Sequence, residues 1–225
     1  MCHKFQVRIY DIIFTIYVDI QKNYAIFNIN ERIFMKKEIK KVIWQGSTQL
    51  APIPAVLIGC GGSCGYKNNL ITVAWAGIIN SDKPMMSISV RKERYSYNII
   101  EETKEFTCNI PTASMADKVD YCGVVSGRKV DKFAETRLTP IAGSQVKSPI
   151  VAECPLSLEC KVKDIIHLGS HDLFLAEIVA VQVSEDFISE NNKLNLDKEN
   201  LLAYCHGAYY NLGEKIGTFG FSVKK

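Results

Sequence analysis

The sequence predicts a mainly β fold with a few short helices, and three observations carry this prediction. Residues 86–90 alternate apolar residues and serine with a period of two, which is typical of a half-buried strand. Residues 69–77 form an apolar, β-prone run that ends in glycine. Residues 156–166 and 173–183 are two long strand-like runs separated by the turn 167–171, which together indicate a hairpin.

Composition sets the class of protein. The chain has 225 residues, of which 47% are hydrophobic and 23% are charged, enough for a full core in one globular domain with an appendage. The net charge of +3 is spread along the chain, and no basic run is longer than the doublets Lys36-Lys37 and Lys40-Lys41. We therefore expect neither nucleic acid nor a membrane as a partner, whereas an anionic small ligand stays open.

The first 34 residues are rich in isoleucine, tyrosine and phenylalanine, yet their longest uncharged apolar run, 12–18, is too short to span a bilayer. Met35 starts a more regular pattern. We therefore divide the chain into residues 1–34, an N-terminal extension or the product of a start codon placed too far upstream, and residues 35–225, the main domain. An N-terminal peptide of the native protein that begins before Met35 would remove the second alternative.

The eight cysteines contain no Cys-x-x-Cys pair, which argues against a zinc ribbon or a dithiol motif. Most lie in apolar runs, so we interpret them as small buried residues in a reducing, cytoplasmic environment. A redox pair of Cys60 and Cys64 is the alternative. His167 and His171 are four apart, but Gly169 between them indicates a turn, so we expect no metal site.

The hydrophobic pattern and the capping and turn-forming residues predict further elements. Ser114 and Asp117 resemble a capping box at the start of a short helix that ends at Gly123. The tail 217–221 is apolar, and we expect it to be packed. The expected strands are 39–44, 52–60, 69–77, 86–90 and 105–111, the first helix runs from about 95 to 103, and 201–213 is a final aromatic-rich segment.

The run 69–77 is the first candidate binding element. In a single strand, the bulky residues would face one side and the small residues Thr72, Ala74 and Ala76 the other. A planar ligand could lie on the small face, oriented by the Thr72 hydroxyl and the Asn69 amide. The alternative is an ordinary half-buried core strand.

Two clusters suit an anion. Arg91, Arg94, Ser96 and Tyr97 gather where a strand leads into a helix N-terminus, whose free N–H groups and dipole favour negative charge. Residues 126–133 add a second group of hydroxyls, glycine and cations. A solvated charged turn is the alternative for either cluster, and the presence of two clusters weakens it.

A set of motifs follows the order of one known family along the chain. They are Pro54-Ala55-Val56-Leu57, Asn69-x-x-Thr72-Val73-Ala74-Trp75, Ser89-Val90-Arg91 with Arg94-Tyr95-Ser96, Asn109-Ile110-Pro111, Cys122-Gly123 with Ser126-Gly127-Arg128, Asp131-Lys132-Phe133, Gly169-Ser170-His171-Asp172 with Phe174, and Gly217-Thr218-Phe219-Gly220. In these motifs, residues 35–225 resemble the flavin reductase-like family with the FMN-binding split-barrel fold, most closely its flavoredoxin-type branch. The extension 1–34 has no counterpart in the family, and the glycine-rich stretch with Cys64 departs from its usual pattern.

The resemblance implies a Greek-key β-barrel that forms a homodimer with one FMN per subunit near the interface. It also implies that Asn109 and Cys122 lie close to the flavin and that His171 flanks the face where a reductant docks. The implied FMN-binding residues are Asn69, Thr72, Val73, Ala74, Trp75, Arg91, Arg94, Tyr95, Ser96, Asn109, Cys122, Ser126, Gly127, Arg128 and Lys132.

The resemblance leaves two functions open. In the first, the protein is an oxidoreductase of the flavin reductase type that takes hydride from NAD(P)H and passes electrons on through FMN. In the second, it is a flavoredoxin-like carrier that exchanges electrons with redox proteins. A β-barrel scaffold without a ligand is a third interpretation. The cofactor would carry the redox chemistry, which agrees with the lack of a catalytic dyad in the sequence.

Overall fold

The computed structural model describes residues 15–23, 39–196 and 200–223. The chain divides into two units, Met1–Thr48 and Gln49–Lys225. In the first unit, residues 15–23 are helical and 39–48 have no regular structure. The strand expected at 39–44 is wrong: Ile43 is 99% exposed, so the apolar side chains there have no core to cover them. The proposed start at Met35 lies outside the described residues.

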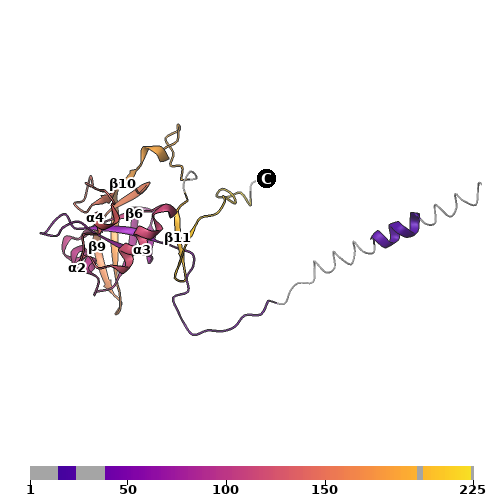
Figure 1. Cartoon of the computed structure of the whole chain (residues 1–225), viewed down its shortest axis with the longest axis horizontal. Coiled ribbons are helices and arrows are strands. Elements are labelled where there is room, and N and C mark those ends of the chain that lie inside the picture. Colours follow the sequence, from indigo (N-terminus) through magenta and orange to yellow (C-terminus); the bar gives the residue numbers. More distant parts are fainter. Residues whose placement is uncertain (1–14, 24–38, 197–199, 224–225) are drawn as a thin grey trace, which may run out of the picture. The chain divides into compact units, whose positions relative to one another are not determined.

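The second unit contains the sheets (Figure 1). Its main sheet is antiparallel and seven-stranded, in the order β3-β2-β6-β9-β10-β5-β4. These strands are β2 (Val56–Cys60), β3 (Asn69–Val73), β4 (Ala76–Asn80), β5 (Met85–Val90), β6 (Glu105–Ile110), β9 (Leu156–His167) and β10 (Asp172–Val183).

The sheet curls on itself at Ala74 and Trp75. Strands β3 and β4 lie at opposite ends of the strand order, yet only these two residues separate them. Because so short a segment spans at most about 10 Å, the two edges must meet. The single strand expected over 69–77 is therefore wrong: it breaks at this bend, where the backbone N–H of Ser89 donates to the Trp75 carbonyl at 2.9 Å.

A smaller sheet of three strands, in the order β1-β11-β12, adds a second layer. Its strands are β1 (Ile53–Pro54), β11 (Leu202–Cys205) and β12 (Ala208–Asn211), and β7 (Pro140–Ile141) pairs with β8 (Ile150–Val151) elsewhere. The tight turn between β11 and β12 holds Gly207 at a φ of 87°, a conformation that favours glycine.

Three α-helices accompany these sheets, α2 (Tyr95–Thr103), α3 (Ala116–Val124) and α4 (Lys132–Thr136), with 3₁₀ turns η1 (Ala113–Met115) and η2 (Glu185–Phe187). Helix α2 begins where the sequence predicted. The capping box is wrong, because a 3₁₀ turn precedes α3: Met115 is its N-cap and the Ser114 hydroxyl pairs with Thr112 instead.

Strands β2 and β3 are buried on both faces, which explains their nearly unbroken apolar sequences. Val56, Ile58 and Ile71 pack into the core inside the curled sheet, together with α2. Leu57 and Leu70 pack on the opposite side, against α3 and α4. The helices α3 and α4 are therefore fixed against the strands that lead into the bend.

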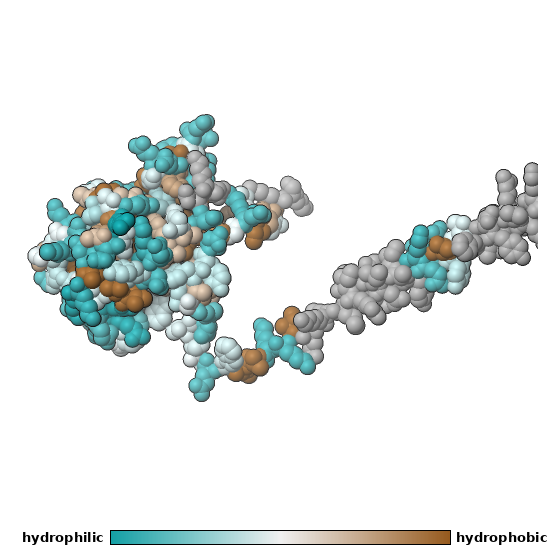
Figure 2. Space-filling model, in the orientation of Figure 1, coloured by the Kyte–Doolittle hydropathy of each residue, from teal (hydrophilic) through white to brown (hydrophobic). Residues whose placement is uncertain are grey.

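The surface is mostly hydrophilic on the face shown in Figure 2, where hydrophobic residues form separate patches. The packed tail expected at 217–221 is wrong, because Phe219 is fully exposed and the segment contains neither helix nor strand. Among the described helices, none combines the length and apolar character needed to cross a membrane.

Candidate functional site

Two adjoining pockets lie where the β3–β4 bend meets α2 and α3. The Trp75 pocket has a volume of about 480 Å³ and is lined by residues 71–75, Ser89–Arg91, Arg94, Asp120, Gly123, His171, Tyr204, Tyr209 and others. The Lys132 pocket has a volume of about 570 Å³ and is lined by Ile71, Arg91, Glu93–Ser96, Val125–Gly127 and Lys132. Ile71, Arg91 and Arg94 line both, so the two pockets are neighbours that share part of their walls.

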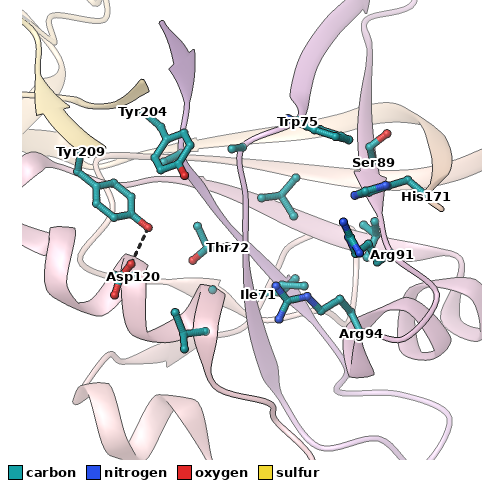
Figure 3. A pocket seen from close by; sticks show the side chains of 16 residues that line it. Ile71, Thr72, Trp75, Ser89, Arg91, Arg94, Asp120, His171, Tyr204 and Tyr209 are labelled. Carbon is teal, nitrogen blue, oxygen red and sulfur yellow. Dashed lines mark hydrogen bonds between the residues drawn. The ribbon is translucent and has the colours of Figure 1, made fainter. Parts of the chain in front are cut away.

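The Trp75 pocket has two unlike sides (Figure 3). Trp75 and His171 lie on one side with their ring centroids 4.6 Å apart, near Arg91 and Arg94. Tyr204 and Tyr209 face them from the small sheet. Aromatic walls around a slot of this size suit a planar ligand.

Thr72 lies between these sides in Figure 3. Its hydroxyl donates to the backbone carbonyl of Val119 in α3, so that hydrogen is already used. The oxygen can still accept a hydrogen bond. The Cβ of a side chain at Gly123 would lie 3.3 Å from Thr72 Cβ, so a glycine keeps this wall thin.

The Tyr204 and Tyr209 side of the pocket was not predicted from the sequence. The Tyr209 hydroxyl donates to Oδ1 of Asp120 in α3 at 3.1 Å. Burial and this hydrogen bond raise the pKa of Tyr209 to about 12, so its hydroxyl is neutral at physiological pH. Only the pairing of β11 with β1 brings these tyrosines to the pocket, and no local pattern signals that pairing.

His171 reaches the pocket from the turn between β9 and β10. Next to it, the buried Asp172 accepts hydrogen bonds from Tyr97 and His167, each at 2.7 Å, and fixes this turn. Burial acts to raise the pKa of Asp172, but these bonds and Lys92 outweigh it and lower that pKa to about 2. Burial, then the charge of Arg91, lowers the pKa of His171, which favours its neutral form.

The two predicted anion clusters converge in the Lys132 pocket. Arg91 and Arg94 lie between β5 and α2, and Ser96 lies in the first turn of α2. Ser126 follows α3, and Lys132 is the first residue of α4. Arg94 is the N-cap of α2 and its side chain does not cap the helix, so the positive end of the helix dipole faces this region without a capping side chain. This pocket is suited to a phosphate or another group rich in negative oxygen.

Four predicted contact residues line neither pocket. Asn69 is buried, and its side-chain amide donates to the Ser96 hydroxyl at 2.8 Å. Asn69 therefore holds Ser96, which lines the Lys132 pocket, without lining that pocket itself. Cys122 is buried, with its carbonyl bonded to Lys132. Arg128 is exposed, and its guanidinium lies 5.6 Å from the Tyr95 ring centroid.

Asn109 is the fourth, and its geometry contradicts a place beside a ligand. It is fully buried and its amide is saturated by the protein. The nitrogen donates to Leu57 and Thr107, and the oxygen accepts from Val151 and Ser157. Through these hydrogen bonds, Asn109 links its own strand, β6, to β2, β8 and β9.

Comparison with known proteins identifies the family of the chain. Residues 49–213 match the family model described as the flavin reductase like domain. A flavoredoxin of Desulfovibrio vulgaris is similar in structure, with a TM-score of 0.76 and 32% identity over 83% of this chain and 100% of that one. A flavoredoxin from Methanosarcina acetivorans is also similar in structure, with a TM-score of 0.74 and 29% identity over 82% of this chain and 97% of that one.

An FMN-binding protein from Thermus thermophilus shares the fold, with a TM-score of 0.66 and 22% identity over 82% of this chain and 99% of that one. The predicted fold, a mainly β split barrel, is confirmed by these likenesses and by the curled antiparallel sheet. The family match and the structural likenesses support flavin binding and an oxidoreductase role in general. The chain belongs to the flavin reductase-like family.

Proposed function

We propose that this protein binds FMN across the two pockets and is an oxidoreductase of the flavin reductase type that uses NAD(P)H. One observation carries the proposal: an aromatic-walled pocket and a cationic pocket lie next to each other and share Ile71, Arg91 and Arg94 as lining residues. FMN has the same two parts, a planar ring and a phosphate. When bound, FMN takes electrons from a donor and passes them on, and the cofactor itself carries this chemistry.

The donor groups of the site fit such a ligand. Arg91 and Arg94 are exposed at the junction of the pockets, and guanidinium groups bind phosphate in a bidentate manner. The N-terminus of α2 adds N–H groups and a favourable dipole. We assign the ring to the side of residues 71–75, where Trp75 and the two tyrosines line the pocket with aromatic surface.

A double variant tests this placement. Replacing Arg91 and Arg94 with alanine removes two charge-assisted contacts, each worth roughly 1.5–3 kcal/mol, so the FMN dissociation constant should rise by at least about a hundredfold. Fluorescence titration measures it. Lys129→Ala is the matched control, because Lys129 is exposed and lines neither pocket. Equal FMN affinity in the double variant and the control would refute the site.

A flavoredoxin-like electron carrier is the second candidate, favoured by the similarity to two flavoredoxins. Mixing the FMN-loaded protein with NADH or NADPH without oxygen separates the two functions. Rapid bleaching of the yellow flavin absorption supports the reductase. A flavin that stays oxidised with both donors, but is reduced by a redox protein, supports the carrier.

A further inference from the structure

One buried carboxylate, that of Asp172, contacts three different elements. Asp172 is fully buried at the start of β10, and its Oδ2 accepts hydrogen bonds from Tyr97 of α2 and His167 of β9, each at 2.7 Å. The ammonium group of Lys92, in the turn between β5 and α2, lies 3.4 Å from the same oxygen. Among the residues that the structure describes, no group donates to Oδ1. All three contacts therefore depend on one oxygen atom.

The turn that contains Lys92 also carries the two arginines of the site. Arg91 begins this turn and Arg94 ends it, and the backbone N–H of Arg94 donates to the Arg91 carbonyl at 3.1 Å. The backbone N–H of Tyr97 in turn donates to the Arg94 carbonyl at 3.0 Å. Asp172 contacts the chain at Lys92 and again at Tyr97. It therefore holds the chain on both sides of Arg94.

Asp172 is also joined to the aromatic side of the Trp75 pocket. It directly follows His171, whose ring centroid lies 4.6 Å from that of Trp75. In the sheet, Asp172 is paired with Val90 of β5, the residue before Arg91. His171 and Arg91 both line the Trp75 pocket and lie on the same side of it in Figure 3. The position of one relative to the other therefore depends on Asp172.

The contacts of Asp172 involve a full charge. Burial acts to raise the pKa of Asp172, but its hydrogen bonds and Lys92 lower that pKa to about 2, so the group is a carboxylate at neutral pH. Burial, then the hydrogen bond to Asp172, raises the pKa of Tyr97, so the tyrosine hydroxyl keeps its proton and remains a donor. Hydrogen bonds to a charged acceptor are stronger than those between neutral groups. A neutral amide at position 172 would therefore weaken several contacts together.

We propose that Asp172 is a positioning residue, which holds the two arginines of the site at a fixed distance from His171. It acts through Lys92 and Tyr97, because it lines neither pocket itself. The inference rests on the proposed function, in which the arginines bind the phosphate of FMN. Loss of the carboxylate should therefore weaken binding of the phosphate more than binding of the ring.

The preference for FMN over riboflavin tests this role, because riboflavin lacks the phosphate. Asp172→Asn replaces the carboxylate with an amide of nearly the same shape. In fluorescence titrations, the FMN dissociation constant should rise about tenfold in this variant, and the riboflavin dissociation constant by less than about threefold. A merely structural role would change both constants by the same factor. A ratio of the two constants equal to that of the wild type would therefore overturn the inference.

A second variant breaks one contact at an exposed position, where folding should not suffer. Lys92→Met should raise the FMN dissociation constant by about fivefold in the wild type, but much less in Asp172→Asn, where Lys92 has no carboxylate to contact. Lys163→Met is the matched control, because it breaks the ion pair of another exposed lysine, with Glu177 at 2.6 Å, and lines neither pocket. It should keep the FMN affinity of the wild type.

Two results of this comparison would contradict the account in different ways. An equal effect of Lys92→Met in both backgrounds would mean that Lys92 acts on FMN by its own charge, which overturns the inference and leaves the proposed function intact. Failure of the wild type to bind either flavin would overturn the proposed function and the inference with it.

Discussion

At Gly127, the absence of a side chain lets this wall of the Lys132 pocket pack closely against Asn69 and Tyr95. A Cβ at this position would lie 2.0 Å from Oδ1 of Asn69 and 3.1 Å from Cδ1 of Tyr95. Its φ is not in the left-handed region, so the constraint is one of space and not of backbone conformation. The Asn69 amide donates a hydrogen bond to the Ser96 hydroxyl, so a displaced Asn69 would also move Ser96 in the wall of the Lys132 pocket.

Gly127→Ala should therefore weaken FMN binding. We expect an overpacking cost of about 1–3 kcal/mol and a roughly tenfold rise in the FMN dissociation constant, measured by fluorescence titration. Gly77→Ala is the control, since a Cβ at Gly77 meets no atom within 4 Å and its φ is also not left-handed. Wild-type affinity in Gly127→Ala would mean that this wall does not contact the ligand.

At the scale of elements, Glu159 of β9 holds the segment before β8. It is fully buried and accepts hydrogen bonds from the backbone N–H groups of Ser144, Gln145 and Val146 and from Gln182 of β10. Burial acts to raise the pKa of Glu159, but these bonds outweigh it and lower that pKa to about 2. The carboxylate thus replaces regular backbone pairing in this segment.

Glu159→Gln should lower the free energy of unfolding by about 2–4 kcal/mol at pH 7, because an amide leaves buried N–H groups without an acceptor. The lowered pKa means that the stabilisation is full above about pH 4.5 and is lost as pH falls through about 2. Urea unfolding at pH 7 and pH 2.5 measures this. Glu135→Gln, at an exposed position of α4, is the control. A difference between Glu159→Gln and wild type that stays constant with pH would contradict this assignment.

Some elements defined by local pattern were predictable from the sequence, although the strand at 39–44 and the capping box at Ser114 were not. The hairpin of β9 and β10 and the helix α2 follow from alternation and helical spacing, and both are confirmed. The bend at Ala74 and Trp75 was missed because its residues are as β-prone as their neighbours. It is set by the closure of the whole sheet, which brings Ser89 to the Trp75 carbonyl.

The candidate site divides in the same way. Charge and hydroxyl spacing predicted two separate anion-suited clusters, one with Arg94 and one with Lys132, and the structure brings both residues to the Lys132 pocket. Family resemblance alone placed Asn109 near the flavin, but four strands use its amide. Tyr209 was missed because it reaches the pocket only through the small sheet.

At the scale of the whole molecule, both pockets belong to the second unit. Their lining residues lie between Ala55 and Tyr209, inside the segment 49–213 that matches the family. Removing residues 1–48 should therefore leave the FMN dissociation constant and the urea midpoint unchanged. Fluorescence titration and urea unfolding of the shortened chain measure these. Lost FMN binding would show that the first unit contributes to the site.

The expected homodimer stays a prediction. Light scattering on the purified protein should give the mass of two chains. The mass of one chain, with FMN still bound, would show that the site is complete within a single chain.

The central claim is that one FMN spans the Trp75 pocket and the Lys132 pocket. A crystal structure of the FMN-loaded protein tests it most directly. We predict density for the ring along residues 71–75 and density for the phosphate within hydrogen-bonding distance of Arg91 or Arg94. Flavin density away from both pockets would contradict the account.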